Sequence, residues 1–354
     1  MNQAAPRLPR QLMQHVVLAL VLCLAPNLSG CSVVSEDCTD PSCDDLLLAA
    51  LLSYFKQSDL FVAVGQNGVL RTSVDGVVWS SQNLAAATLE GVGFDSQYFY
   101  ASGISDTAYR SADGASWTQL ASLNTGTSDS YNSIVSYNGI LVAGGGAGEL
   151  RRSADNGQTW TNLSTVPTGA SVDDLEVGGG QLRGVNANNM YMLFNNDATS
   201  YTELLPTGAT FLRAMAYYSG VWVVAGSAGY VARTSDDGAS WTNQILNAAF
   251  GFEGAAYGNG RFVVAGHDGT NTGVWTSLDG GFTWTQSSPP LGRTRGVAFA
   301  NGRFVLAGNG GLLAYSATPE IGSSWVNVSQ GADHSFNISG RSQVDVEGAL
   351  GDIY

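Results

Sequence analysis

A short motif rich in Ser, Asp, Gly and Trp recurs along most of this chain, and its regular spacing constrains the fold more than any other feature. The fullest copy runs from Ser277 to Trp284 and reads Ser-Leu-Asp-Gly-Gly-Phe-Thr-Trp. Its Ser and Asp side chains can accept hydrogen bonds from backbone N–H groups within a tight turn, and its glycines tolerate positive φ. The Trp begins the next strand and offers a large apolar surface for burial. Each copy of this motif, which we call the box, therefore predicts a hairpin with an aromatic anchor.

Seven copies of the box follow one another at intervals of 38 to 42 residues when they are aligned on the turn Asp. The aligned positions are Asp75, Asp113, Asp155, Asp197, Asp237, Asp279 and, in seventh place, Thr318. The copies at 195–201 and 316–325 are degraded, but each keeps an aromatic residue after the turn. A period near 40 residues, with four short strands per unit, is typical of a propeller blade.

Composition and patterning agree with an all-β fold. The chain of 354 residues contains 45 Gly and only 12% charged residues, and its short apolar runs are separated by Gly, Asn, Asp and Ser. This pattern predicts many short strands. All units share polar tips and none looks like a capping repeat, which favours a closed ring over a solenoid. We therefore expect a seven-bladed β-propeller of four-stranded antiparallel blades spanning residues 60–354.

The two ends of the propeller region predict how the ring closes. The first unit begins at Leu60–Gly65, which matches the second strand of the other units, and no inner strand precedes it. The tail at 333–341 resembles an inner strand followed by a Gly-Arg turn. We expect this tail to complete the first blade.

The N-terminal 30 residues predict a secretory signal peptide. Arg7 and Arg10 precede an apolar run at 16–25, which is too short to span a bilayer. The segment Leu28-Ser29-Gly30-Cys31 resembles the lipobox of bacterial lipoproteins, in which Cys31 would become the lipidated residue. By resemblance to sorting rules, Ser32 would favour the outer membrane, on its periplasmic or cell-surface side. The alternative is an ordinary signal with Cys31 as a free thiol.

Residues 31–59 are expected to form a spacer between lipid and propeller. Cys38 and Cys43 predict a small disulfide outside the reducing cytosol, and two thiols without neighbouring His residues make a poor zinc site. The apolar run at 46–55 is expected to be a short helix, with a strand as the alternative. The formal net charge of −14 argues against nucleic acid as a partner.

The boxes resemble the Asp-box, or bacterial neuraminidase repeat, over about four fifths of the chain. Arginines that precede the box Ser or Thr, together with Gly-x-x-Gly, look most like the seven-bladed photosystem II stability and assembly factors. These arginines are Arg71, Arg110, Arg152 and Arg233. The resemblance implies that Asp75, Asp113, Asp155, Asp237 and Asp279 are structural and lie away from the functional face. Sialidases in this group have six blades and an Arg-Ile-Pro motif, which the chain after residue 30 lacks.

A second set of residues emerges when the inner strands are aligned on their turn glycine. Seven residues upstream, every unit has a polar residue, and we call this set the polar column. Its members are Glu90, Asn132, Asp173, Arg213, Glu253, Arg295 and Asp333. Because strands alternate in direction, the column is expected to ring the channel mouth at the end opposite the boxes. It predicts a ligand or partner site, and the alternative is a solvated ring of charges at loop ends.

The sequence therefore favours a non-catalytic, lipid-anchored scaffold that binds an envelope protein or a glycan, with no catalytic residue, cofactor or metal site expected. One alternative is a carbohydrate-active enzyme that uses Glu90 or Glu253. Another is a glycan-binding module with Tyr131 and Phe252 as aromatic platforms. His267 lies in a loop on the same face and could form half of an acid/base pair, or could be an ordinary loop residue.

Overall fold

The computed structural model describes residues 60–84, 87–95, 97–123, 130–163, 169–289, 291–329 and 336–341. The predicted signal peptide, Cys31, the Cys38–Cys43 disulfide, the 46–55 segment and Asp333 lie outside these residues. No helix within the described part is long and apolar enough to cross a membrane.

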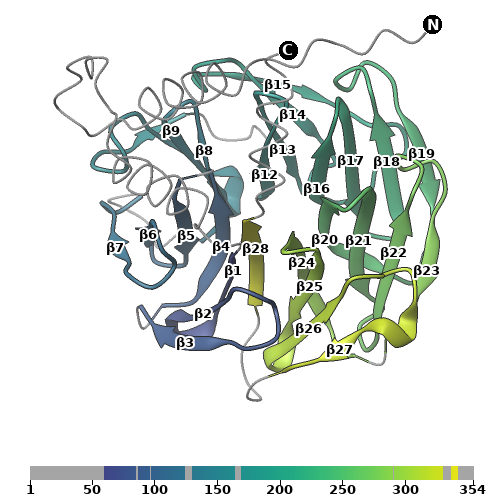
Figure 1. Cartoon of the computed structure of the whole chain (residues 1–354). Coiled ribbons are helices and arrows are strands. Elements are labelled where there is room, and N and C mark those ends of the chain that lie inside the picture. Colours follow the sequence, from purple (N-terminus) through teal and green to yellow (C-terminus); the bar gives the residue numbers. More distant parts are fainter. Residues whose placement is uncertain are drawn as a thin grey trace, which may run out of the picture. The chain divides into compact units, whose positions relative to one another are not determined.

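The described chain forms seven four-stranded antiparallel sheets, which are the seven blades of an all-β propeller (Figure 1). In each blade the strands follow one another from the innermost to the outermost. Blade one contains β28 (Phe336–Arg341), β1 (Leu60–Gly65), β2 (Val69–Ser73) and β3 (Ser80–Asn83). Blade two contains β4 (Leu89–Phe94), β5 (Phe99–Gly103), β6 (Ala108–Ser111) and β7 (Thr118–Gln119). Blade three contains β8 (Tyr131–Tyr137), β9 (Ile140–Gly145), β10 (Leu150–Ser153) and β11 (Thr161–Asn162).

The remaining blades follow the same plan. Blade four contains β12 (Val172–Gly178), β13 (Gln181–Asn186), β14 (Tyr191–Phe194) and β15 (Tyr201–Leu204). Blade five contains β16 (Leu212–Tyr218), β17 (Val221–Gly226), β18 (Tyr230–Thr234) and β19 (Thr242–Ile245). Blade six contains β20 (Gly251–Gly258), β21 (Arg261–His267), β22 (Thr272–Ser277) and β23 (Thr285–Ser287). Blade seven contains β24 (Thr294–Ala300), β25 (Arg303–Gly308), β26 (Leu312–Ser316) and β27 (Val326–Asn327). Short 3-10 turns lie at Gln66–Gly68, Gly146–Gly148, Asn309–Gly311 and Gly322–Ser324.

The apolar second strands are explained by burial on both faces. In β1, Phe61 and Ala63 pack in a core cluster with blade seven, whereas Leu60, Val62 and Val64 pack with blade two. Alternate side chains of a strand point to opposite faces, so a strand between two neighbouring blades must be apolar throughout. Seven such clusters fill the interfaces between successive blades.

The predicted closure of the ring by the C-terminal tail is confirmed. Strand β28 pairs antiparallel with β1, so the last and first described strands share one blade, as the yellow and purple ribbons show (Figure 1). One detail of the prediction is wrong, because Gly340 and Arg341 pair with Phe61 and Leu60 within the strand and do not form a turn. Phe336 pairs with Gly65 and Asn337 with Val64 without a register shift, so the described part of β28 contains no bulge.

The box turns have the hydrogen bonds that their composition predicts. In the Ser277–Trp284 copy, the Ser277 hydroxyl donates to Asp279 at 2.8 Å and accepts from the Gly281 N–H. Asp279 accepts from the backbone N–H groups of Phe282 and Thr283, and Trp284 Nε1 donates to the Gly281 carbonyl. Side chains of the turn therefore accept hydrogen bonds from its own backbone N–H groups, and its Asp has a structural role.

The assignment of Asp237 to the box of blade five is wrong. Asp236 accepts from the Thr234 hydroxyl at 2.7 Å and from the Ser240 N–H at 2.9 Å, which are the contacts of a box Asp. Asp237 has φ of 59° and instead pairs with Arg183 of blade four. Two adjacent aspartates made the alignment ambiguous by one residue, and the hydrogen bonds from Thr234 and Ser240 identify Asp236 as the box Asp.

Arginine side chains of one blade donate hydrogen bonds to the box turn of the next blade. Arg152 Nε donates to the Asp197 carbonyl at 2.9 Å, and Arg233 Nε donates to the Gly280 carbonyl at 2.8 Å. Arg303 of blade seven contacts the box turn of blade one in the same way. The arginines before the box Ser or Thr at positions 152 and 233 therefore join neighbouring blades.

Candidate functional site

A β-bulge near the start of the inner strand presents the polar column in blades two to seven. In blades two to seven, the register between the first two strands shifts at one residue, and that residue is the column member every time. The six bulge residues are Glu90, Asn132, Asp173, Arg213, Glu253 and Arg295. A bulge leaves one residue without a partner across the ladder and re-aims its side chain. The same backbone irregularity therefore places one polar side chain of each of these six blades at the start of its inner strand.

The column lies at the end of the propeller opposite the box turns, as predicted. Leu212 and Phe252, which directly precede column members, pair with the last glycines of the second strands, Gly226 and Gly266. The box turns follow the third strands, whose last residues pair with the starts of the second strands. Each inner strand also contacts the inner strand of the next blade, including β28 with β4 and β24. The column members are therefore brought together around one mouth.

The residue before each bulge points into the core, which excludes the predicted aromatic platforms. Tyr131 and Phe252 occupy this position and are both 0% exposed. Each belongs to a cluster between neighbouring blades. The prediction that they form a rim platform for glycans is wrong, because strand alternation turns them away from solvent.

On blades two to four the column forms a chain of polar contacts. The Ser130 hydroxyl contacts the Glu90 carboxylate and lies 3.3 Å from Asn132 Oδ1. Asn132 Nδ2 lies 3.4 Å from Asp173 Oδ1, which also accepts from the Ser171 hydroxyl at 2.7 Å. This half of the mouth is acidic and its side chains are held by neutral donors.

On blades five to seven the mouth is basic. Glu253 lies between two arginines, with its Oε2 atom 3.3 Å from Arg213 Nη1 and 3.8 Å from Arg295 Nη1. The arginine side chains are 40% and 42% exposed, whereas the Glu253 side chain is only 15% exposed. Arg295 Nε also donates to Asn309 Oδ1 at 3.0 Å. The carboxylate therefore positions two guanidinium groups that still face solvent.

His267 lies at the edge of this basic half. Its Nδ1 accepts from the Gly269 N–H at 3.0 Å, and its Nε2 lies 3.9 Å from Glu253 Oε1. Burial lowers its pKa; Glu253 opposes that change, and nearby Arg295 and Arg293 add to it. His267 is the last residue of β21 rather than a loop residue, and its occupied Nδ1 leaves Nε2 as the ring nitrogen nearer to Glu253.

The acidic half contains two adjacent carboxyl groups, those of Asp173 and Asp174, and burial disfavours the charged form of both. Burial raises the pKa of Asp173, and the Ser171 hydroxyl and Arg213 oppose that rise. Burial also raises the pKa of Asp174 to about 7, against the Met215 N–H bond. Asp174 Oδ2 accepts from the Met215 N–H of the next inner strand at 2.9 Å, and Ser133 accepts in the same way from Leu175 at 3.1 Å. In blades three and four, the side chain of the residue after the bulge thus links its inner strand to that of the next blade.

The alignment missed several residues that hold the column in place. Ser130 and Ser171 each lie two residues before a column member and bond to it. Arg293 has the same offset from Arg295 and helps to lower the pKa of His267. Testing this second offset in the repeat alignment would have found all three. Asn309 could not have been found in this way, because only the fold brings β25 and its following turn beside Arg295.

The arrangement is suited to binding more than to metal or acid–base chemistry. No group of three or more His, Cys, Asp or Glu side chains among the residues that the structure describes could hold a metal ion. The two exposed guanidinium groups can donate paired hydrogen bonds to a carboxylate or phosphate. Glu253, the acid between them, already faces two arginines and a histidine.

Comparisons with known proteins show the fold. No protein-family model matches the chain, and no curated protein matches it. Among solved structures, it is similar to YCF48 bound to D1 peptide, with 20% identity and a TM-score of 0.53 over 69% of this chain and 84% of that one. It is also similar to the WD40 β-propeller domain of Doa1, with 17% identity and a TM-score of 0.55 over 71% of this chain and 86% of that one.

Proposed function

We propose that this protein is a non-catalytic binding scaffold that captures an acidic segment of a partner protein at the channel mouth. The observation that carries the proposal is the pair Arg213 and Arg295, each about 40% exposed and held on either side of Glu253. Guanidinium groups oriented in advance lose less side-chain entropy when they bind a carboxylate. The solved YCF48 structure, in which a propeller of similar fold holds a D1 peptide, supports a peptide as the kind of ligand.

The same proposal places the scaffold at the bacterial envelope. Cys31 would carry the lipid, most consistently at the outer membrane, and the propeller would act on its periplasmic or cell-surface side. The signal-like segment and the lipobox-like Leu28–Cys31 are its support.

The glycosidase alternative has less support from the mouth. It needs one carboxyl group ready to protonate a leaving group and a second facing it across the sugar. Both Glu253 oxygens already face cationic or imidazole groups, and the Glu90 carboxylate contacts Ser130.

The test is a pull-down from solubilised envelope with the full chain as bait, followed by a binding titration with the recovered partner. Arg213→Ala combined with Arg295→Ala should weaken capture at least tenfold, because two charge-assisted hydrogen-bonding groups are lost. Arg152→Ala is the matched control, since it removes a charge beside a box turn. The affinity of the unchanged chain should also fall with added salt.

Equal capture by the mouth variant and the unchanged chain would contradict the proposal. Hydrolysis of a polysaccharide that disappears in Glu90→Gln or Glu253→Gln would favour the enzyme instead.

A further inference from the structure

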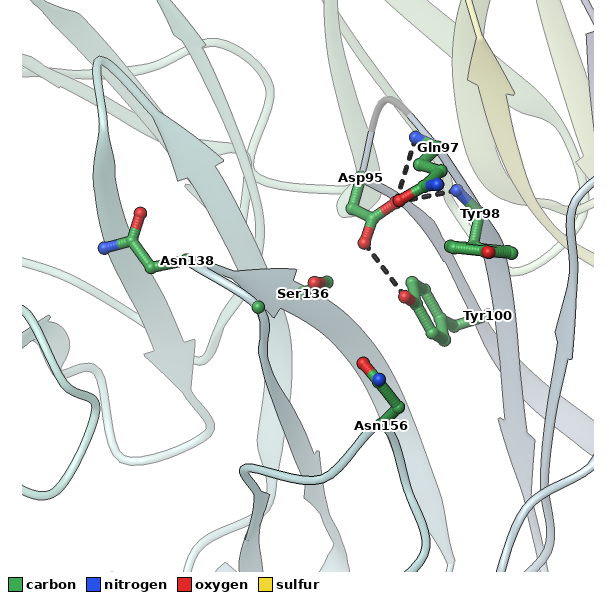
Figure 2. A pocket seen from close by; sticks show the side chains of 8 residues that line it. Asp95, Gln97, Tyr98, Tyr100, Ser136, Asn138 and Asn156 are labelled. Atoms are coloured by element: carbon green, nitrogen blue, oxygen red, sulfur yellow. Dashed lines mark hydrogen bonds between the residues drawn. The ribbon is translucent and has the colours of Figure 1, made fainter. Parts of the chain in front are cut away.

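A small polar pocket lies between blades two and three, at the box end and so at the opposite end from the polar column. Its volume is about 250 Å³. One wall comes from the turn between β4 and β5 with Tyr100 on β5, and the other from Ser136 on β8 and Asn156 in the box turn of blade three (Figure 2). The sequence alignment gave no indication of it, because it combines turns from two different blades.

Asp95 accepts three hydrogen bonds within the first wall. Its Oδ1 accepts from the backbone N–H groups of Gln97 at 3.0 Å and Tyr98 at 2.7 Å, and its Oδ2 accepts from the Tyr100 hydroxyl at 2.9 Å (Figure 2). Tyr100 is only 3% exposed and also bonds to the Ser136 hydroxyl. Burial raises the pKa of Tyr100, with Asp95 adding to the rise, so the phenol stays protonated. The network leaves one Asp95 Oδ2 site and the Ser136 oxygen able to accept further hydrogen bonds.

The second wall contributes the Asn156 amide to the pocket, and the first wall contributes the Tyr98 ring. Asn156 is exposed in the left-handed region, at φ of 58°, and its side chain points towards the Asp95–Tyr100 network in Figure 2. The amide of Asn138 points away, and its Nδ2 lies 3.4 Å from the Asn196 carbonyl. The half-buried Tyr98 ring carries the Arg110 guanidinium 4.7 Å from its centroid. Donors, acceptors and an aromatic ring therefore surround one small space.

This chemistry selects the ligand class. A carboxylate at the pocket wall disfavours anions, and the volume lies below the roughly 300–1,000 Å³ typical of drug-sized ligands. A neutral ring with several hydroxyl groups can both donate to Asp95 and Ser136 and accept from the Asn156 amide. We infer that this pocket binds a single neutral sugar residue of a glycan, independently of the peptide capture proposed for the mouth.

The test titrates the full chain separately with glucose, galactose, mannose and N-acetylglucosamine, using saturation-transfer NMR for binding and amide shifts for location. At least one sugar should bind and should move the amide signals of Ser136 and Gly139. Asn156→Gly combined with Ser136→Ala should weaken that binding about tenfold, because two hydrogen bonds are lost. Glycine keeps the left-handed turn, so the double variant should still fold.

Two controls separate this site from the mouth and from general effects. Asn259→Gly makes the same kind of change in the β20–β21 turn of blade six, where φ is 47°, and should leave binding unchanged. Arg213→Ala with Arg295→Ala should also leave it unchanged, whatever its effect on peptide capture. The inference is overturned if none of the four sugars binds, or if the pocket variant binds as tightly as the unchanged chain.

Discussion

At the scale of single residues, the same kind of side chain does different work at the two ends of each blade. A box Asp accepts hydrogen bonds within its own turn, as Asp155 does from Gln158, Thr159 and Ser153. A column residue lies at a bulge of the inner strand and faces the mouth, as Asp173 does in blade four. The backbone conformation, more than the residue type, therefore decides whether a carboxylate holds its own turn or contacts side chains of a neighbouring blade.

The box aspartates predict how stability responds to acid. The Thr159 hydroxyl and N–H hold the pKa of Asp155 down at about 2, against about 3.9 in an unfolded chain. A lowered native pKa contributes stability above pH 4 that is lost as the pH falls towards 2. Asp113, Asp236 and Asp279 have similarly lowered values. Asp155→Asn should therefore give a flatter decline of the unfolding free energy between pH 4 and 2, measured by urea titration at each pH.

Thr159→Val is the companion variant, since it keeps the carboxylate but removes its hydroxyl donor. It should flatten the same part of the curve by a smaller amount. Curves for both variants that run parallel to that of the unchanged chain would contradict this account of the box.

At the scale of elements, β28 decides whether the ring is closed. Its Ile338 is 6% exposed and packs with Phe61, Val69 and Trp79 of blade one and with blade seven. The innermost strand of blade one thus comes from the opposite end of the chain. Closure makes the first and last blades of the propeller depend on each other, whereas the two end repeats of a solenoid do not touch.

Ile338→Ala should lower the free energy of unfolding by about 2–5 kcal/mol, because it leaves a cavity in the cluster that joins blades one and seven. Val326→Ala on the outer strand β27, where Val326 is 44% exposed, should change it by less than about 0.5 kcal/mol. Denaturant titrations measure both. A similar small effect at the two positions would show that the tail does not hold the ring together.

At the scale of the whole molecule, the propeller offers two ends with different chemistry. The mouth end carries the bulges, the arginine pair and the acidic half of the polar column. The box end carries the self-satisfied turns, the arginine contacts between blades and the small pocket beside Asp95. A rigid ring with two such ends could hold two different ligands at once.

The proposed lipid anchor is tested on the whole chain in a bacterial host. Cys31→Ser should move most of the protein from the membrane fraction to the soluble fraction and abolish labelling by a fatty-acid probe. Cys38→Ser, which leaves the lipobox-like segment intact, should remain in the membrane fraction. Fractionation followed by blotting measures the location of both variants. A Cys31→Ser protein that stays membrane-bound and labelled would contradict the proposal.

The sequence by itself determined the number of blades, the four-strand plan, the closing tail and the positions of the polar column on blades two to seven, but not the bulges at those positions. It could do so because seven copies of one unit constrain each other, and because alternation and turn chemistry are local properties. Tertiary structure decided what local patterns leave open. It selected Asp236 over Asp237 by hydrogen bonding and buried Tyr131 and Phe252 between blades. It also placed Arg213, Glu253 and Arg295 in contact, although 40 residues or more separate neighbours in the chain, because the packing of successive blades brings each inner strand beside the next.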